Sequence, residues 1–320
     1  MRRLLVLLAV ALAAVTAGSA AVAPAPAQAL VVGIGDQKPD MFADPLFAET
    51  GIRHARLAVS WDAMNHPWQV RELDAWLQGA KAAGVQPLVG FWHSRTNRRS
   101  LPKPELFKFQ FRKFRARYPW VTTFATWNEA NHCGEPTCNR PALVAAYWKA
   151  MRRECRSCRV LASELLDMPN MAKWVRSFRR AAGFDPGIWG LHNYIDANRF
   201  RTSGTRALLR ATRGKVWFTE TGGIVKRRTK VNVPLNESSA HAAKATRWVF
   251  DKLVPLDRKR IQRVYLYHWN TPPGRQSWDS GLVNQHDQPR AAFRVLRKVL
   301  RRLAPALPGV PLGQATDPSR

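Results

Sequence analysis

A regular alternation of strand-like and helix-like segments between residues 31 and 303 is the feature that most constrains the fold. Eight segments rich in β-branched and aromatic residues are candidate strands: Val31–Asp36, His54–Trp61, Gln86–His93, Thr123–Asn131, Arg159–Asp167, Ile188–Asp196, Val216–Gly223 and Arg263–Asn270. Segments with apolar residues three and four positions apart are candidate helices: Val70–Ala83, Leu106–Arg117, Leu143–Arg153, Met171–Ala182, Thr205–Arg213, Ser239–Leu253 and Ala291–Leu303. Only the first connection, around Pro45–Thr50, is short.

Strands that alternate with helices indicate a parallel sheet, because each helix returns the chain to the same end of the sheet. Glycines, which are favoured at helix C-termini, stand just before four of the strands: Gly51, Gly84, Gly183 and Gly214. Eight such units in one domain predict a closed (β/α)8 TIM barrel. An open, cofactor-binding sheet is the weaker alternative, since Gly33-Ile34-Gly35 lacks the third glycine of a phosphate-binding fingerprint. We therefore expect no cofactor.

The two ends of the chain differ from this pattern. Arg2 and Arg3 precede the apolar run Leu4–Val15, and Ala27-Gln28-Ala29 resembles a cleavage site, so residues 1–29 are predicted to be a secretory signal peptide. The alternative is a membrane anchor, which would need about 20 apolar residues. We expect one catalytic domain over residues 30–304 and a flexible Pro- and Gly-rich tail over residues 305–320. The expected product is a secreted, extracellular protein without a membrane span after cleavage.

The formal charge is +29, or +27 without Arg2 and Arg3. Such a balance favours anionic partners such as acidic polysaccharide, cell-wall polymer, a membrane surface or nucleic acid. Much of the excess, however, falls on predicted outer helices, as in residues 112–117 and 297–302, where it can be a solvated face. An anionic glycan is therefore one alternative for the partner, and no specific recognition of nucleic acid is expected.

Four cysteines form two close pairs, Cys133 with Cys138 and Cys155 with Cys158. A single zinc site would need all four thiolates about 2.3 Å from the metal. The helix-like segment between the pairs would separate them by about 20 Å at about 1.5 Å per residue. Two local disulfides in an oxidising compartment fit the spacing better, although a free or redox-active Cys155–Cys158 pair is an alternative.

Chemistry in such a barrel gathers at the C-terminal ends of the strands. The residues expected there mix carboxylates, histidines and aromatic rings: Asp36, Arg56, Trp61, Trp92, His93, Asn128, Glu129, Glu164, Asp167, His192, Tyr194, Glu220, His268 and Trp269. This mixture suits a sugar, because carboxylates supply acid and base groups and aromatic faces cover the apolar faces of pyranose rings. His132 and Trp278 are weaker candidates for sugar contact, and any of these rings can instead be a framework group that only packs.

Glu129 and Glu220 are the sharpest candidates for catalysis. They are expected to end the fourth and seventh strands, across the barrel mouth from one another. Retaining glycoside hydrolysis needs two carboxyl groups about 5–5.5 Å apart, one as nucleophile and one as proton donor. The donor is expected to have a raised pKa, caused by partial burial and the negative nucleophile. A structural ion pair at the barrel rim is the alternative for either glutamate, and Glu164 is a weaker substitute carboxylate.

With these residues in place, the sequence resembles clan A of the glycoside hydrolases, the 4/7 superfamily, over roughly residues 31–303. The resemblance implies roles for the matching residues. Trp127-Asn128-Glu129 is similar to the clan's Asn-Glu pair, in which Glu is the acid/base and Asn binds the sugar 2-hydroxyl, and Phe218–Gly222 looks like the nucleophile strand. The remaining implied sugar-site residues are Arg56 and Tyr194 beside the nucleophile, His192 and the platform Trp269. His93 is a candidate for substrate contact from its place at the rim, not from the resemblance. Cellulase-type family five and xylosidase-type family thirty-nine look nearest.

The function expected from the sequence is a retaining glycosidase that cleaves a β-linked poly- or oligosaccharide, and it is expected to act as a monomer without a catalytic metal. Two other classes stay open. A non-catalytic carbohydrate- or cell-wall-binding barrel would have lost one of the carboxylates, and both are present. A basic surface module that holds anionic polymer would show binding that depends strongly on salt and little on Glu220.

Overall fold

The computed structural model describes residues 29–227, 235–272, 274 and 277–304. The predicted tail and, except for Ala29, the predicted signal peptide lie outside these residues. A parallel sheet of nine strands in the order β5-β4-β3-β2-β1-β10-β8-β7-β6 forms the centre of the described part. Its strands are β1 (Val31–Gly35), β2 (His54–Ser60), β3 (Gln86–Trp92), β4 (Thr123–Ala125), β5 (Arg159–Leu161), β6 (Glu164–Leu166), β7 (Ile188–His192), β8 (Lys215–Thr221) and β10 (Ile261–Tyr267).

The sheet closes into a barrel at its fifth strand position, which the two short strands β5 and β6 fill together. Each of the strand positions around the barrel is called a stave below. Only Ala162 and Ser163 separate β5 from β6; β5 pairs with β4, and β6 pairs with β7. The amide of Glu164 also donates to the carbonyl oxygen of Trp127 at 2.9 Å, so the two halves together join β4 to β7. Counted this way the sheet has eight staves, and the predicted (β/α)8 barrel is confirmed.

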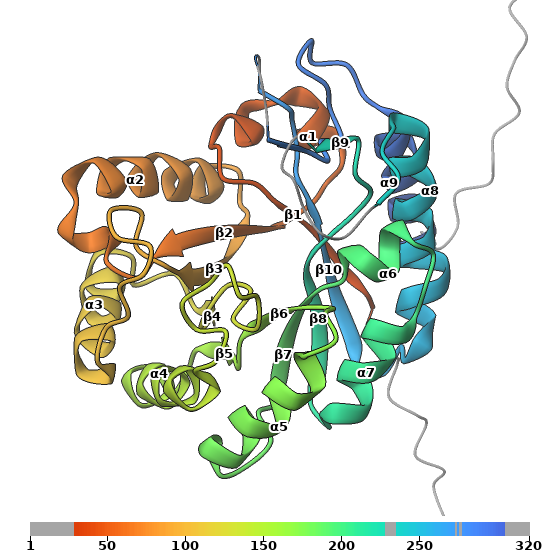
Figure 1. Cartoon of the computed structure of the whole chain (residues 1–320). Coiled ribbons are helices and arrows are strands. Elements are labelled where there is room, and N and C mark those ends of the chain that lie inside the picture. Colours follow the sequence, from red (N-terminus) through yellow and green to blue (C-terminus); the bar gives the residue numbers. More distant parts are fainter. Residues whose placement is uncertain (1–28, 228–234, 273, 275–276, 305–320) are drawn as a thin grey trace, which may run out of the picture.

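Helices surround the strands on the outside (Figure 1). They are α1 (Pro45–Glu49), α2 (Pro67–Ala82), α3 (Pro104–Arg117), α4 (Pro141–Glu154), α5 (Met171–Ala182), α6 (Tyr194–Asn198), α7 (Ser203–Ala211), α8 (Ser239–Trp248) and α9 (Ala291–Leu303). Short 3-10 segments are η1 (Asp40–Ala43), η2 (Ala63–Asn65) and η4 (Val254–Leu256), a π-helical turn is η3 (Val249–Leu253), and β9 (Lys226–Arg227) pairs with β11 (Trp278–Asp279).

The helices bury one face against the barrel, as their periodicity predicts. Met171, Trp174, Val175 and Phe178 are the buried residues that set the inner face of α5, and Gly183 ends the helix with φ of 87°. A left-handed C-cap of this kind has little steric cost only for glycine. Inside the barrel a separate apolar layer forms the floor: Leu88, Ala125, Leu161, Trp217 and Tyr265. Among the described residues, the barrel interior is therefore packed at this layer.

The disulfides and the charged outer face of α3 agree with what the sequence predicted. The cysteines pair as Cys133–Cys138 and Cys155–Cys158, which is the local pairing expected. Two of the arginines on the outer face of α3 pair across helices, Arg112 with Glu154 and Arg117 with Asp74. Among the described residues no helix combines the length and apolarity that crossing a bilayer requires.

Candidate functional site

Glu129 reaches the site from a turn, not from the end of a strand. The predicted strand Thr123–Asn131 is observed only as β4 (Thr123–Ala125), and the following residues leave the sheet. Asn128 is held to the barrel by its amide, which donates to the carbonyl oxygen of Phe91 at 2.6 Å. Glu129 then adopts φ of 48°, a conformation uncommon for a residue with a side chain. Backbone strain of this kind is concentrated at functional sites, because the surroundings must hold it in place.

Glu220 lies near the end of β8 and is held by two side chains. Arg56 Nη1 on β2 donates to Glu220 Oε2 at 2.8 Å, and the hydroxyl of Tyr194 donates to Oε1 at 3.1 Å. Both partners of this carboxylate were expected from the sequence. With one donor on each oxygen, the Glu220 carboxylate is held in a fixed orientation.

Arg56 is itself held by a buried carboxylate directly beneath the site. Its Nε and Nη2 donate to the two oxygens of Glu164 at 2.6 and 2.7 Å, and Nη2 also donates to Asn128 Oδ1 at 2.5 Å. A Cβ on Gly90 would stand 2.5 Å from Glu164 Oε2, and one on Gly190 would stand 2.8 Å from its Cγ. Glycine at both positions therefore makes room for this carboxylate, which anchors Arg56 and is fully buried.

His192, the last residue of β7, links the two candidate catalytic carboxylates. Its Nδ1 lies 3.2 Å from Glu129 Oε1 and 4.0 Å from Glu220 Oε2. One side-chain atom from each of Glu129, His192 and Glu220 lies within 4.8 Å of the other two. The side chains of Glu129 and Glu220 remain 23% and 15% exposed, so both carboxylates can be reached from solvent.

The pKa pattern differs in one respect from the sequence expectation. Burial alone would lower the pKa of His192, but the charge of Glu220 and the hydrogen bond to Glu129 raise it to about 9. Burial also works to raise the pKa of Glu129, yet the hydrogen bond and charge of His192 outweigh it, so this pKa is lowered. The free protein therefore holds the shared proton on the imidazole, whereas the sequence predicted a Glu129 with a raised pKa.

The same three residues have the donor types of a metal site. Their surroundings disfavour that use, because a metal would have to displace a proton from an imidazole whose pKa is raised to about 9. The guanidinium of Arg56 already neutralises Glu220. The donor set thus fits a proton-transfer pair better than a cation.

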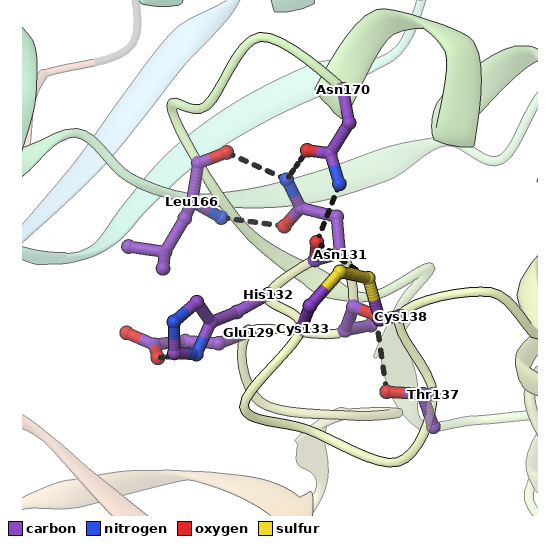
Figure 2. The surroundings of a disulfide bond; sticks show 9 residues. Glu129, Asn131, His132, Cys133, Thr137, Cys138, Leu166 and Asn170 are labelled. Carbon is purple, nitrogen blue, oxygen red and sulfur yellow. Dashed lines mark hydrogen bonds and ion pairs between the residues drawn. A yellow bond between two sulfur atoms is a disulfide. The ribbon is translucent and has the colours of Figure 1, made fainter. Parts of the chain in front are cut away.

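A disulfide-closed loop follows Glu129 directly (Figure 2). The side chain of Asn131 bonds the backbone of Leu166 in both directions, at 2.9 and 2.8 Å, and Asn170 Nδ2 donates to the carbonyl oxygen of Asn131 at 2.8 Å. Thr137 Oγ1 donates to the carbonyl oxygen of Ala130 at 3.1 Å. These contacts fasten both ends of the loop to its neighbours and so hold the turn that carries Glu129.

The loop also contains Glu135, which sequence reasoning missed. It is buried, and its carboxylate lies 2.7 Å from His93 Nδ1 and 3.2 Å from Trp127 Nε1. His93, at the end of β3, therefore has one ring nitrogen occupied by a framework carboxylate. The available signal was an acidic residue inside a short Cys-x4-Cys loop that follows the turn carrying Glu129.

Trp269 and Trp278, two aromatic candidates for sugar contact, differ in how deeply they are buried. Trp269 is fully buried, donates its indole N–H to Asp44 at 2.7 Å and packs edge-on against Phe47, so in this structure it presents no face to a ligand. Trp278 is only partly buried and packs edge-on against Tyr194, with ring centroids 5.0 Å apart. Of the two indoles, Trp278 is thus the one that packs on Tyr194, whose hydroxyl donates to Glu220. His132 lies near Glu129, with Nδ1 3.9 Å from Oε2.

The chain matches no family model and no curated protein. Solved structures, in contrast, resemble it over most of its length. A GH5_18 from Streptomyces cattleya in complex with Manb1-4GlcNAc has a TM-score of 0.63 at 15% identity, covering 87% of this chain and 82% of that one. A glucosidase from Croceicoccus marinus has a TM-score of 0.62 at 12% identity, covering 87% and 68%. A family 39 glycoside hydrolase from Bacteroides cellulosilyticus has a TM-score of 0.56 at 13% identity, covering 85% and 64%.

The chain thus shares the (β/α)8 barrel fold of these glycoside hydrolase structures. The predicted resemblance to clan A is confirmed at the level of the fold, and families five and thirty-nine are both represented among the similar structures.

Proposed function

We propose that this protein is a retaining glycoside hydrolase in which Glu220 is the nucleophile and Glu129 the acid/base. The observation that carries the proposal is the approach of the two carboxylates, with an oxygen of each within 4.8 Å of the other. Retaining enzymes hold these groups about 5–5.5 Å apart, whereas inverting enzymes need about 6.5–9.5 Å to admit a water. The contacts support these roles, because Arg56 and Tyr194 both donate to Glu220 and Glu129 lies within hydrogen-bond distance of His192.

The reaction would proceed in two balanced steps. Glu220 attacks the anomeric carbon and forms a glycosyl ester, while the leaving oxygen takes a proton from the carboxyl of Glu129. Water then attacks the same carbon and loses a proton to the Glu129 carboxylate, and Glu220 departs with the electrons of the ester bond. The anomeric configuration is inverted twice and therefore retained.

The proton that Glu129 delivers can come from His192. In the free protein the proton resides on the imidazole, within hydrogen-bond distance of Glu129 Oε1. A bound sugar excludes water from both groups, and desolvation favours the neutral pair over the ionised pair. Transfer along this hydrogen bond would leave a neutral imidazole and a protonated carboxyl aimed at the glycosidic oxygen.

Substitution of the two glutamates tests the mechanism. We expect Glu220→Ala to lose nearly all turnover, and Glu129→Ala to lose about 10²–10⁴-fold on glycans but much less on aryl glycosides whose leaving group needs no protonation. Azide should restore both variants, with opposite product anomers read by proton NMR. Thr219→Ala, next to the nucleophile in β8, is the control for disturbance of the strand. Full activity of Glu220→Ala on the natural glycan would contradict the assignment.

We further propose a β-linked poly- or oligosaccharide as substrate, bound by Arg56, Asn128, His192 and Tyr194 around the catalytic pair, with His93 at the β3 side. Support comes from the aromatic and carboxylate rim and from similar structures that hold Manb1-4GlcNAc.

We also propose that the protein is exported from the cell. A positive start, an apolar run and a small-residue cleavage site support a signal peptide, and both disulfides suit an oxidising compartment. Mass spectrometry of protein from the culture medium should find Leu30 as the first residue. A chain retained in the cell with residues 1–29 intact would contradict this.

A further inference from the structure

The short helix α6 (Tyr194–Asn198) begins with Tyr194, whose hydroxyl donates to Glu220 Oε1 at 3.1 Å. Tyr194 is buried, and burial together with the charge of Glu220 holds the pKa of its phenol well above the usual value. The phenol therefore keeps the proton that it donates to the carboxylate. A helix of five residues is not stable by itself, so the place of Tyr194 depends on what holds the two ends of α6.

Asp167 holds the N-terminal end of α6 from the neighbouring strand. It follows β6 directly, and its Oδ2 and Oδ1 accept from the amides of Asp196 at 2.7 Å and Ile195 at 3.2 Å. Its own amide donates to the carbonyl oxygen of His192 at 3.2 Å, which is the last residue of β7. The first amides of a helix have no partner within the helix and need such acceptors. Asp167 thus fixes the point at which the chain turns from β7 into α6.

Asn198 holds the other end of α6 to the segment that follows the nucleophile. Its Nδ2 donates to the carbonyl oxygens of Tyr194 at 3.0 Å and Gly222 at 2.9 Å, and its Oδ1 accepts from the amide of Ile224 at 2.9 Å. Gly222 and Ile224 come just after β8, which carries Glu220. Asn198 therefore ties the backbone of Tyr194 to the backbone beside the nucleophile.

A second aspartate makes the position of Asp167 costly. Asp196 accepts from the amides of Gly204 at 3.0 Å and Thr205 at 2.6 Å, at the start of α7. One oxygen of each aspartate lies 3.3 Å from the point that a Cβ on Gly204 would occupy. Burial, together with the charge of Asp196, raises the pKa of Asp167 to about 7. An apolar residue would avoid the cost of burying this carboxyl, and groups with perturbed pKa values are concentrated near functional sites.

We propose that Asp167 and Asn198 are positioning residues that hold the Tyr194 hydroxyl on Glu220. Both side chains are buried, with exposures of 6% and 1%, so they act on the reaction through this hydrogen bond and not by touching a substrate. The hydrogen bond orients the carboxylate that attacks the anomeric carbon. The inference deepens the proposed function and rests on it for the effect on turnover, but the hydrogen bond itself can be measured without turnover.

Carbon-13 NMR of the tyrosine phenol carbons measures the hydrogen bond. The chain has five tyrosines, and the signal of Tyr194 is the one that Tyr194→Phe removes. We expect this signal to move in Asp167→Asn and in Asn198→Ala, because the hydroxyl is no longer held on the carboxylate. Asp185→Asn is the matched control, since Asp185 also accepts a backbone amide, that of Arg213 at 2.7 Å, but precedes β7 at the opposite end of the barrel. A Tyr194 signal that stays in place in both variants would overturn the proposal.

Turnover of an aryl glycoside measures the consequence for the reaction. Tyr194→Phe removes one hydrogen bond to a charged group and should lower kcat about tenfold or more. Asp167→Asn should lower kcat about threefold to tenfold, with KM changed less than about twofold. Because Asp167 acts through Tyr194, the double variant should match Tyr194→Phe alone within about twofold. Two losses that multiply in the double variant would show that Asp167 acts by another route.

Gly204→Ala tests the same contact if Asp167→Asn does not fold. The added Cβ would stand 2.6 Å from Asp167 Cβ, so it displaces Asp167 while the carboxyl is kept. We expect the Tyr194 signal to move and kcat to fall. Gly187→Ala is the control, because its Cβ would have nothing within 4 Å. A folded Gly204→Ala variant with the Tyr194 signal and kcat of the wild type would contradict the positioning role.

The two measurements separate this inference from the proposed function. Turnover by the wild-type protein, together with an unmoved Tyr194 signal or with losses that multiply, refutes the positioning role and leaves the proposed function standing. A Tyr194 signal that moves in both variants of a protein that hydrolyses no glycoside refutes the proposed function instead, and the positioning of Tyr194 on Glu220 stands.

Discussion

At the scale of single residues, the site is a balance of five ionisable side chains. Three carboxylates, Glu129, Glu164 and Glu220, surround two cations, Arg56 and His192, within one hydrogen-bonded group. With the imidazole protonated the group carries one net negative charge, and one further proton would make it neutral. The proposed acid catalysis needs no further proton, because the proton on His192 can pass to Glu129 and leave the net charge of the group unchanged.

The histidine should therefore control the basic limit of activity. His192 has a pKa raised to about 9, so the proton shared with Glu129 should be retained until pH approaches that value. In His192→Phe, Glu129 would instead hold its proton only through the nearby charge of Glu220. We expect the basic limb of kcat/KM to move from near pH 9 to below pH 7, while the acidic limb changes little.

A pH–rate profile on an aryl glycoside with a poor leaving group measures this shift. Phe200→Leu, a change at a partly exposed ring on the α6–α7 connection, is the control for a general loss of packing. An unchanged basic limb in His192→Phe would show that the imidazole does not hold the catalytic proton.

Glu164 makes a separate contribution, to stability. Burial works to raise its pKa, but the charge and hydrogen bonds of Arg56 lower it to about 2. A carboxyl whose folded pKa lies below its unfolded value stabilises the fold above pH 4.5, and this contribution is lost as pH falls toward 2. Glu164→Gln leaves a buried guanidinium partly unpaired, which costs about 3–5 kcal/mol.

Urea unfolding at pH 7 measures that cost. Glu154→Gln is the matched control, because Glu154 also pairs with an arginine, Arg112, but the arginine side chain is 58% exposed. Exposed pairs contribute only about 0–1 kcal/mol. A Glu164→Gln variant that loses no more stability than this control would contradict an anchoring role for the pair.

At the scale of elements, the sequence predicted the strands and helices well where apolar residues recur at a regular spacing. Met171–Ala182 and Ala291–Leu303 have the predicted bounds, because one apolar face faces the barrel throughout each helix. Several predicted strands were too long, two of them by four residues or more: Thr123–Asn131 stops at Ala125, and Ile188–Asp196 stops at His192. Past those points the backbone follows contacts with distant residues, which a local pattern does not record.

The residues of the candidate site also divide into those that the sequence located and those that it did not. The structure brings together Arg56, Asn128, Glu129, His192, Tyr194 and Glu220. All but Arg56, which lies within β2, stand close to the end of a strand that periodicity could locate. Trp269 lies just past the end of β10 and was expected at the site, yet its ring is turned into the core by Asp44 and Phe47. The direction of a side chain beyond a strand end depends on its long-range partners, so the sequence alone could not predict it.

At the scale of the whole molecule, the positive charge lies largely outside the site. The outer face of α9 exposes Arg294, Arg297, Lys298 and Arg301, while the pairs at the barrel mouth are locally balanced. Such a surface attracts polyanions at long range, and salt screens that attraction because the Debye length falls from about 10 Å at 0.1 M to about 3 Å at 1 M. Binding of polyanions should thus be a property of the helical exterior and separable from hydrolysis.

Heparin, as a polyanionic glycan, provides the measurement. We expect its affinity to fall at least a hundredfold between 0.05 and 0.5 M salt, as counterion release dictates, and to be the same for Glu220→Ala. Arg297→Glu with Arg301→Glu should weaken it further, whereas hydrolysis of a neutral aryl glycoside should change less than about twofold over the same salt range. Heparin binding that resists 1 M salt and depends on Glu220 would place the anion in the catalytic site, and the charge would then select the substrate itself.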